Sequence, residues 1–148
     1  MATYYAVPAQ KLGEGYAKDR ANSNVTSGNV RVDVVKYTVP AGTLAIADKI
    51  VWRNALPKGA RVLPQTKVYF AAGTASSTIN LGDGASAARY LAATSVASAG
   101  SATAEAAAAS GATYEVGTAA NDEQIVSTVA GAVLAAGQVI TLHLYWVQ

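Results

Sequence analysis

The chain has 148 residues, 51% of them hydrophobic, and a formal net charge of +2, which fits one globular domain of ordinary size. It has no cysteine, which excludes a disulfide framework, thiolate metal sites and thiol catalysis. No run of about 18 apolar residues and no signal-peptide pattern is present, so we expect no membrane segment and no secretion by the standard route.

The first 29 residues predict an extended N-terminal arm. Gly, Asn and Ser are frequent here, and no period of 2 or 3.6 is sustained. Tyr4, Tyr5 and Tyr16 nevertheless make the segment too apolar for a solvated tail. We therefore expect residues 1–29 to lie on a surface of their own domain or of a neighbour, with residues 30–148 forming the folded domain.

The first strands follow directly after this arm. Val30–Val39 alternates, but its apolar phase changes at Val34-Val35, which predicts a β-bulge there. Thr43–Val51 predicts a strand that runs into an irregular segment, with Asn54–Gly59 as a loop.

The middle of the chain predicts three more short strands. Ala60–Leu63 and Thr66–Phe70 are separated by Pro64, which cannot donate to a ladder. Thr78–Leu81 follows, and Gly82-Asp83-Gly84 predicts a tight turn that requires a positive φ. Four side chains are expected to share one face: Val62, Thr66, Val68 and Phe70.

The last third predicts a connection and then strands again. Ser95–Gly111 is rich in alanine but has no large apolar stripe, so we expect a partly ordered connection with at most two helical turns. Thr113–Val116 and Gln124–Val129 predict strands. Val139–Trp146 alternates most clearly and predicts a central strand. Its expected core-facing residues are Ile140, Leu142, Leu144 and Trp146.

About eight short strands with Gly, Pro and Asn turns predict an all-β fold, an antiparallel β-sandwich of jelly-roll type. An immunoglobulin-like sandwich remains the alternative, although its disulfide is absent.

Residues for catalysis or metal binding are sparse. His143 is the only histidine, too few for a cupin-type metal site, and we expect it at a surface or interface. No G-x-S-x-G motif occurs. Asp122 and Glu123 are expected to be solvated turn charges, and Arg89-Tyr90-Leu91 a packing anchor. The sequence therefore predicts no enzyme and no cofactor.

Charge is distributed unevenly along the chain. All eleven Lys and Arg residues lie between Lys11 and Arg89, whereas residues 90–148 carry four acids and no base. The bases are nevertheless dispersed, without interleaved aromatics, and a net charge of +2 is low for a nucleic-acid binder. We expect no nucleic-acid partner.

Several short segments resemble one family. Lys58–Val62, Lys67–Phe70, Thr78–Asp83, Arg89–Ala92 and Ala135–Leu142 are similar to segments of the jelly-roll decoration, or cement, proteins of tailed bacteriophage heads. The resemblance covers about Val30 to Trp146 and consists of strand and turn signatures rather than a chemical site.

The resemblance implies a non-enzymatic virion protein, made in the host cytoplasm, that binds and stabilises the outside of the capsid. Its implied partners are the major capsid protein and further copies of itself, as a dimer or trimer, without membrane or cofactor. The expected capsid or subunit contacts lie in the arm: Tyr4, Tyr5, Tyr16, Lys11, Lys18 and Arg20.

Two other functions remain open. A carbohydrate-binding jelly roll would present aromatic side chains in a groove, for which Trp52 and Tyr90 are the candidates. A tail or baseplate structural module would have a similar composition.

Overall fold

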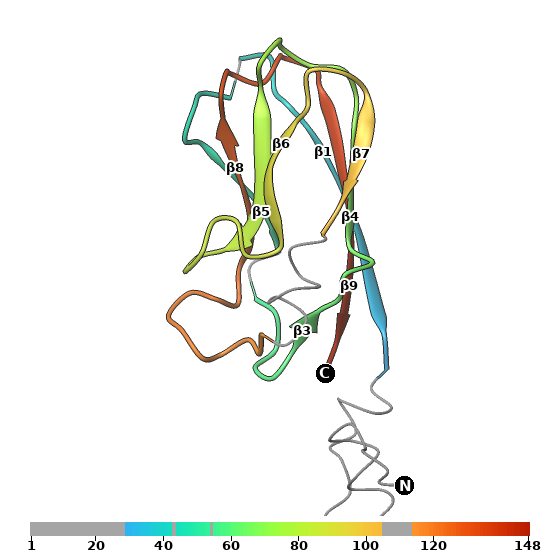
Figure 1. The fold of residues 1–148 in the computed structure, drawn as a ribbon, viewed down its shortest axis with the longest axis vertical. Coiled ribbons are helices and arrows are strands. Elements are labelled where there is room, and N and C mark those ends of the chain that lie inside the picture. The colour runs from blue at the N-terminus through green and yellow to red at the C-terminus, as the bar shows by residue number, and fades with distance from the viewer. Residues whose placement is uncertain (1–28, 43, 54, 105–113) are drawn as a thin grey trace, which may run out of the picture.

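The computed structural model describes residues 29–42, 44–53, 55–104 and 114–148, which form two antiparallel sheets packed face to face (Figure 1). The described residues contain no helix, and hence none of the length and apolar character that crossing a bilayer requires. The strands are β1 (Arg31–Thr38), β2 (Lys49–Arg53), β3 (Arg61–Val62), β4 (Lys67–Phe70), β5 (Thr78–Asp83), β6 (Leu91–Ser95), β7 (Gly100–Thr103), β8 (Ile125–Ala130) and β9 (Val139–Val147).

The strand order confirms the predicted jelly roll. One sheet has the order β1-β9-β4-β7, with the short β3 also paired to β9, and the other has the order β2-β8-β5-β6. The chain changes sheet at every connection except β3 to β4 and β5 to β6, and the first and last strands, β1 and β9, pair with each other. This interleaving is the double Greek key of a jelly roll, not an immunoglobulin order. The two strands that the sequence did not predict are β6 and β7.

Strand β9 is central, as the alternation predicts. It pairs with β1 on one side and with β4 and β3 on the other. Its core-facing side chains are at most 2% exposed: Ile140, Leu142, Leu144 and Trp146. The predicted shared face is confirmed and points into the core, since its four side chains are all buried: Val62, Thr66, Val68 and Phe70.

The predicted bulge in the first strand is wrong. β1 pairs with β9 in one unbroken register from Arg31 opposite Trp146 to Thr38 opposite Val139. The phase change has another cause, because Asp33 takes an inward position at the end of the sandwich. Its carboxylate accepts hydrogen bonds from Arg53 and from the Trp146 indole N–H. The register shifts instead in β2, between Val51 and Arg53, and in β5.

The strand predicted over Thr43–Val51 begins later. Leu44 forms an isolated bridge with Leu134, and Ala47 adopts a φ of 74° in a turn, so regular pairing starts only at Lys49. Thr43 and Asn54 lie outside the described residues, and residues 55–59 form the expected loop.

The segment Ser95–Gly111, expected to be a connection with at most two helical turns, contains a strand in its described part. Gly100–Thr103 forms β7, which pairs with β4. Gly100 lies opposite Phe70 and leaves room for its ring, while Ala102 packs against the core. Strand pairing thus outweighs the helical propensity of alanine. The strand expected at Thr113–Val116 is also wrong: Thr113 lies outside the described residues, and Tyr114–Val116 is not a strand.

Glycines 82 and 84 are required for a different reason from the one predicted. Neither has a positive φ; β5 continues through Gly82 and Asp83. A Cβ on Gly82 would collide with the Ser86 carbonyl oxygen, and one on Gly84 with the Asn121 carbonyl oxygen. The glycines therefore allow close approach of two loops at one end of the sandwich.

Candidate interaction surface

The outward faces of the two sheets differ in side-chain size. Apart from Lys49 and Val51 on β2, the four-stranded sheet presents mainly short side chains, such as Thr128 opposite Lys49 and Ala130 opposite Thr78. The five-stranded sheet presents rows of larger side chains across its strands. One row runs Val34–His143–Lys67–Thr103 and the next runs Lys36–Thr141–Tyr69–Ser101. We call the outward surface of the five-stranded sheet the Tyr69 face.

Tyr69 is the main aromatic group of this face and is 41% exposed. Its ring centroid lies 4.9 Å from that of His143, and the Lys67 ammonium lies 5.1 Å from the Tyr69 ring centroid. The tilted contact with His143 and the cation–π contact with Lys67 hold a large amphipathic side chain in place before any partner arrives. Such rigid aromatic groups contribute strongly to protein interfaces.

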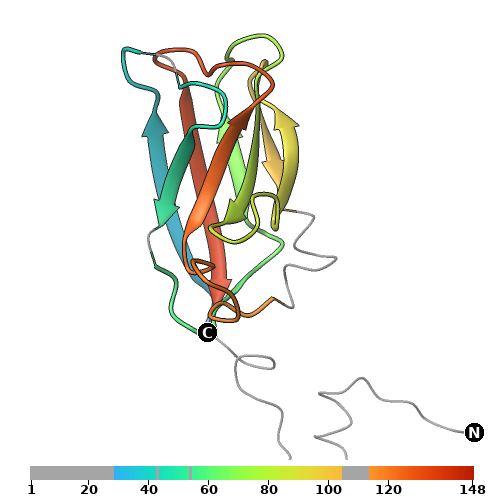
Figure 2. The same ribbon diagram turned by 90° about the vertical axis from the view of Figure 1, so that its left-hand side faces the viewer.

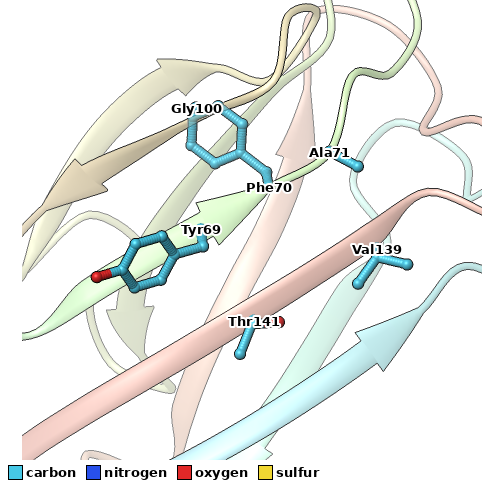
Figure 3. A pocket seen from close by; sticks show the side chains of 6 residues that line it. All are labelled: Tyr69, Phe70, Ala71, Gly100, Val139 and Thr141. Carbon is cyan, nitrogen blue, oxygen red and sulfur yellow. The ribbon is translucent and has the colours of Figure 1, made fainter.

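A shallow open hollow of about 310 Å³ lies beside Tyr69 (Figure 3). The missing side chain at Gly100 contributes to it, since a Cβ there would lie 3.3 Å from the Phe70 ring. The hydroxyl groups of Thr141 and Tyr69 are the polar side-chain groups of an otherwise apolar lining. The hollow therefore suits an apolar side chain of a partner protein better than a charged ligand. Its lining residues are Tyr69, Phe70, Ala71, Gly100, Val139 and Thr141.

The Tyr69 face is also basic. The outward positions of β1, β4, β7 and β9 include Lys36 and Lys67 but no Asp or Glu. Arg61, on β3, is neutralised by Glu115 at 3.0 Å. In the described part of the chain, neither Lys36 nor Lys67 forms an ion pair. The face therefore favours a partner surface that combines apolar and acidic groups.

The buried carboxylates serve the fold. Asp83 accepts hydrogen bonds from the Ala85 and Ser86 N–H groups and pairs with Arg89. The Arg89 guanidinium lies 3.6 Å from the ring centroid of Tyr114. These contacts join the loop after β5 to the loop before β8. Within the described residues, no group of three or more His, Cys, Asp or Glu side chains could hold a metal ion.

The prediction that Asp122 is a solvated turn charge is wrong, because Asp122 is fully buried. Its carboxylate accepts hydrogen bonds from the Tyr114 hydroxyl at 2.6 Å and from three backbone N–H groups. Burial alone would raise its pKa, but these four donors outweigh burial and lower the pKa to about 2. The donating N–H groups belong to Gly117, Thr118 and Ala119.

The lowered pKa predicts acid sensitivity. Because the pKa of Asp122 falls from 3.8 to about 2 on folding, its stabilisation is present above pH 3.8 and is lost as the pH falls through 2. This shift corresponds to about 2 kcal/mol. Urea unfolding at pH 5 and pH 2 should show a stability loss smaller by about this amount in Asp122→Asn than in the wild type. Equal losses in both proteins would contradict the assignment.

The carbohydrate-site candidates are not available on the surface. Trp52 is 6% exposed and donates its indole N–H to the Ser127 hydroxyl at 2.8 Å. Tyr90 is fully buried, and burial, followed by the nearby Asp83, raises the pKa of its hydroxyl. Neither side chain can stack on a sugar, which corrects that prediction. The burial of Tyr90 and Leu91 confirms that Arg89-Tyr90-Leu91 is a packing anchor.

The arm residues predicted to make contacts lie outside the described residues: Tyr4, Tyr5, Tyr16, Lys11, Lys18 and Arg20. His143 is half-buried and faces outward, as expected. Tyr69 was not among the predicted contact residues, although its position between the apolar Val68 and Phe70 of a strand indicates an outward aromatic side chain.

No family model matches the sequence, and no curated protein matches it. Among solved structures, the chain is similar to a chain of the cyanophage Pam1 capsid asymmetric unit, with 27% sequence identity and a TM-score of 0.58. The match covers 83% of this chain and 88% of that chain. The similarity to a phage capsid structure indicates a structural, non-enzymatic role in a virion.

Proposed function

We propose that this protein binds the outside of a bacteriophage capsid and stabilises the shell as a decoration protein. The observation that carries the proposal is the similarity, at 27% identity over 83% of the chain, to a chain of a phage capsid structure. The architecture supports it, since a jelly roll with a preorganised outward aromatic and basic face suits attachment to a protein surface.

The Tyr69 face is the proposed shell contact of the folded domain. Tyr69 and the adjacent hollow supply apolar contact area, while Lys36 and Lys67 would attract acidic groups of the capsid protein. Each contact is modest in size. Copies held by a symmetric shell can nevertheless bind strongly when several attachments act together.

The N-terminal arm is proposed as a second contact region. Its tyrosines, Tyr4, Tyr5 and Tyr16, offer amphipathic contact area, and its bases, Lys11, Lys18 and Arg20, offer positive charge to acidic groups of a partner. The arm would contact either the capsid protein or a neighbouring copy of this chain.

A binding assay on shells that lack this protein tests the proposal. Tyr69→Ala combined with Lys67→Glu should weaken binding at least about tenfold, as expected for removal of a central aromatic contact and reversal of a charge. The matched control is Val51→Ala combined with Lys49→Glu, because both residues are exposed on the opposite sheet.

The control variant should bind as tightly as the wild type. Deletion of residues 1–27 should leave a folded domain, judged by its thermal transition, that binds shells more weakly. If the wild-type protein does not bind shells, the proposed function is wrong. If only the arm deletion weakens binding, the function stands and the Tyr69 face is not the contact.

A further inference from the structure

Strand β1 lies at the edge of its sheet in the described part of the chain. Among the described residues it pairs with β9 alone, over eight residues without a proline or a register shift. Figure 2 shows it at the lateral margin of the sandwich. In an antiparallel ladder, alternate residues direct their N–H and C=O groups to opposite sides, so half of those in β1 point away from the sheet. A long regular edge of this kind is a template for another strand.

The outward side of β1 is apolar as well. Val30 is 60% exposed, Val32 47% and Val34 60%. These three β-branched side chains form a continuous stripe, because residues two apart in a strand point to the same face. Natural edge strands are commonly protected by charges or bulges, but this outward stripe has no charge before Lys36.

We propose that β1 pairs antiparallel with β1 of a second copy, about a two-fold axis that passes beside Val32. This register places Val32 opposite Val32 of the partner subunit and Val30 opposite Val34 of the partner subunit. The apolar stripe is then matched along its length. Exposed valines become cross-strand pairs, which are the stabilising unit of a sheet.

The inward side chains select the same register. It places Arg31 opposite Asp33 of the partner subunit, so two pairs of opposite charges form across the axis. A slip of one residue in each strand would place Asp33 opposite Asp33 of the partner subunit, and like charges directly opposite are unfavourable. The next slip would place Val32 opposite Lys36 of the partner subunit and break the apolar stripe.

The local structure leaves both charged groups accessible. Arg31 is exposed, with its guanidinium 5.1 Å from the Trp146 ring centroid. The Asp33 side chain retains 30% exposure although it accepts bonds from Arg53 and Trp146. A carboxylate can accept further hydrogen bonds, so Arg31 of the partner subunit could join this cluster.

The proposal goes beyond the proposed function and does not depend on it, because it concerns the protein alone in solution. A two-fold axis perpendicular to the sheet would join the two five-stranded sheets edge to edge. It would also place the Tyr69 faces of both copies on the same side of the dimer.

The test is sedimentation of the full chain over a concentration series, comparing Val32→Lys with Val51→Lys. Both valines are exposed to a similar extent, 47% and 49%, and both lie on edge strands, Val32 on β1 and Val51 on β2. The wild type and Val51→Lys should dimerise. Val32→Lys places two like charges opposite each other and should raise the dissociation constant at least about tenfold.

A second measurement fixes the register. Since the chain has no cysteine, Val32→Cys introduces a single thiol. The two-fold axis would place this thiol beside the same thiol of the partner subunit. Directly opposite Cβ atoms lie about 5 Å apart, close to disulfide geometry. With oxidised glutathione, Val32→Cys should form a covalent dimer and Val51→Cys should not. A monomeric wild type, equal cross-linking of both variants, or an oligomer unaffected by Val32→Lys would overturn the proposal.

Discussion

Replacing Asp122 with alanine is expected to destabilise the protein by about 3–5 kcal/mol, the range for breaking a buried charged hydrogen-bond network. The substitution removes the acceptor of the Tyr114 hydroxyl and of three backbone N–H groups in a fully buried site. These donors cannot all reach water without opening the loop. Urea unfolding at pH 7 measures the loss.

The adjacent residue provides a matched control. Glu123 is also an acidic residue of this loop. Its backbone carbonyl accepts a hydrogen bond from the Leu56 N–H group, and a side-chain substitution retains that bond. Glu123→Ala should therefore change stability by no more than about 0.5 kcal/mol. Equal effects at both positions would show that the loop responds to general charge rather than to the Asp122 network.

Replacing Trp146 with alanine is expected to cost about 3–5 kcal/mol, the range for truncating a buried aromatic side chain. Trp146 is 2% exposed and lies opposite Arg31 of β1 and Val62 of β3. Its indole N–H donates to Asp33 at 2.8 Å, and the guanidinium groups of Arg31 and Arg53 lie 5.1 Å from its ring centroid. The side chain thus holds together strands of both sheets.

A graded substitution separates packing from hydrogen bonding. Trp146→Phe keeps an aromatic ring but removes the indole donor. Because Asp33 still pairs with Arg53, the loss should be about 1–2 kcal/mol. The measurement is again the urea midpoint at pH 7. If Trp146→Ala costs less than about 1 kcal/mol, the end of the sandwich does not depend on this residue.

The sequence predicts most of the fold because large side chains with period 2 have few places to go. β9 is the clearest case, since its alternating apolar residues require a buried strand between two neighbours. β7 could not be predicted in the same way. Its residues, Gly100–Thr103, are small, and what makes them a strand is the free side of β4 and the Phe70 ring, both distant in sequence.

The polar sites were harder to predict for a related reason. Asp122 has the local sequence of a solvated turn, and its burial arises from Tyr114 and the surrounding loop. In β1, the exposed valines and the inward Asp33 invert the usual alternation of a half-buried strand. Such inversions are expected where a surface serves contacts outside the domain.

The proposed dimer and the proposed shell contact are compatible in space. A dimer with both Tyr69 faces on one side could make two attachments to a capsid at once. Two linked attachments raise the overall affinity through effective concentration without any new kind of contact. Val32→Lys should then weaken shell binding as well, although it leaves Tyr69, Lys67 and the adjacent hollow of each monomer in place.

Electron cryomicroscopy of virions that carry this protein tests its proposed function most directly. We expect density for a two-sheet jelly roll on the outside of the capsid shell, with the five-stranded sheet facing the capsid protein. Density for this fold in the tail or baseplate, or its absence from purified particles, would show that the protein is not a decoration protein.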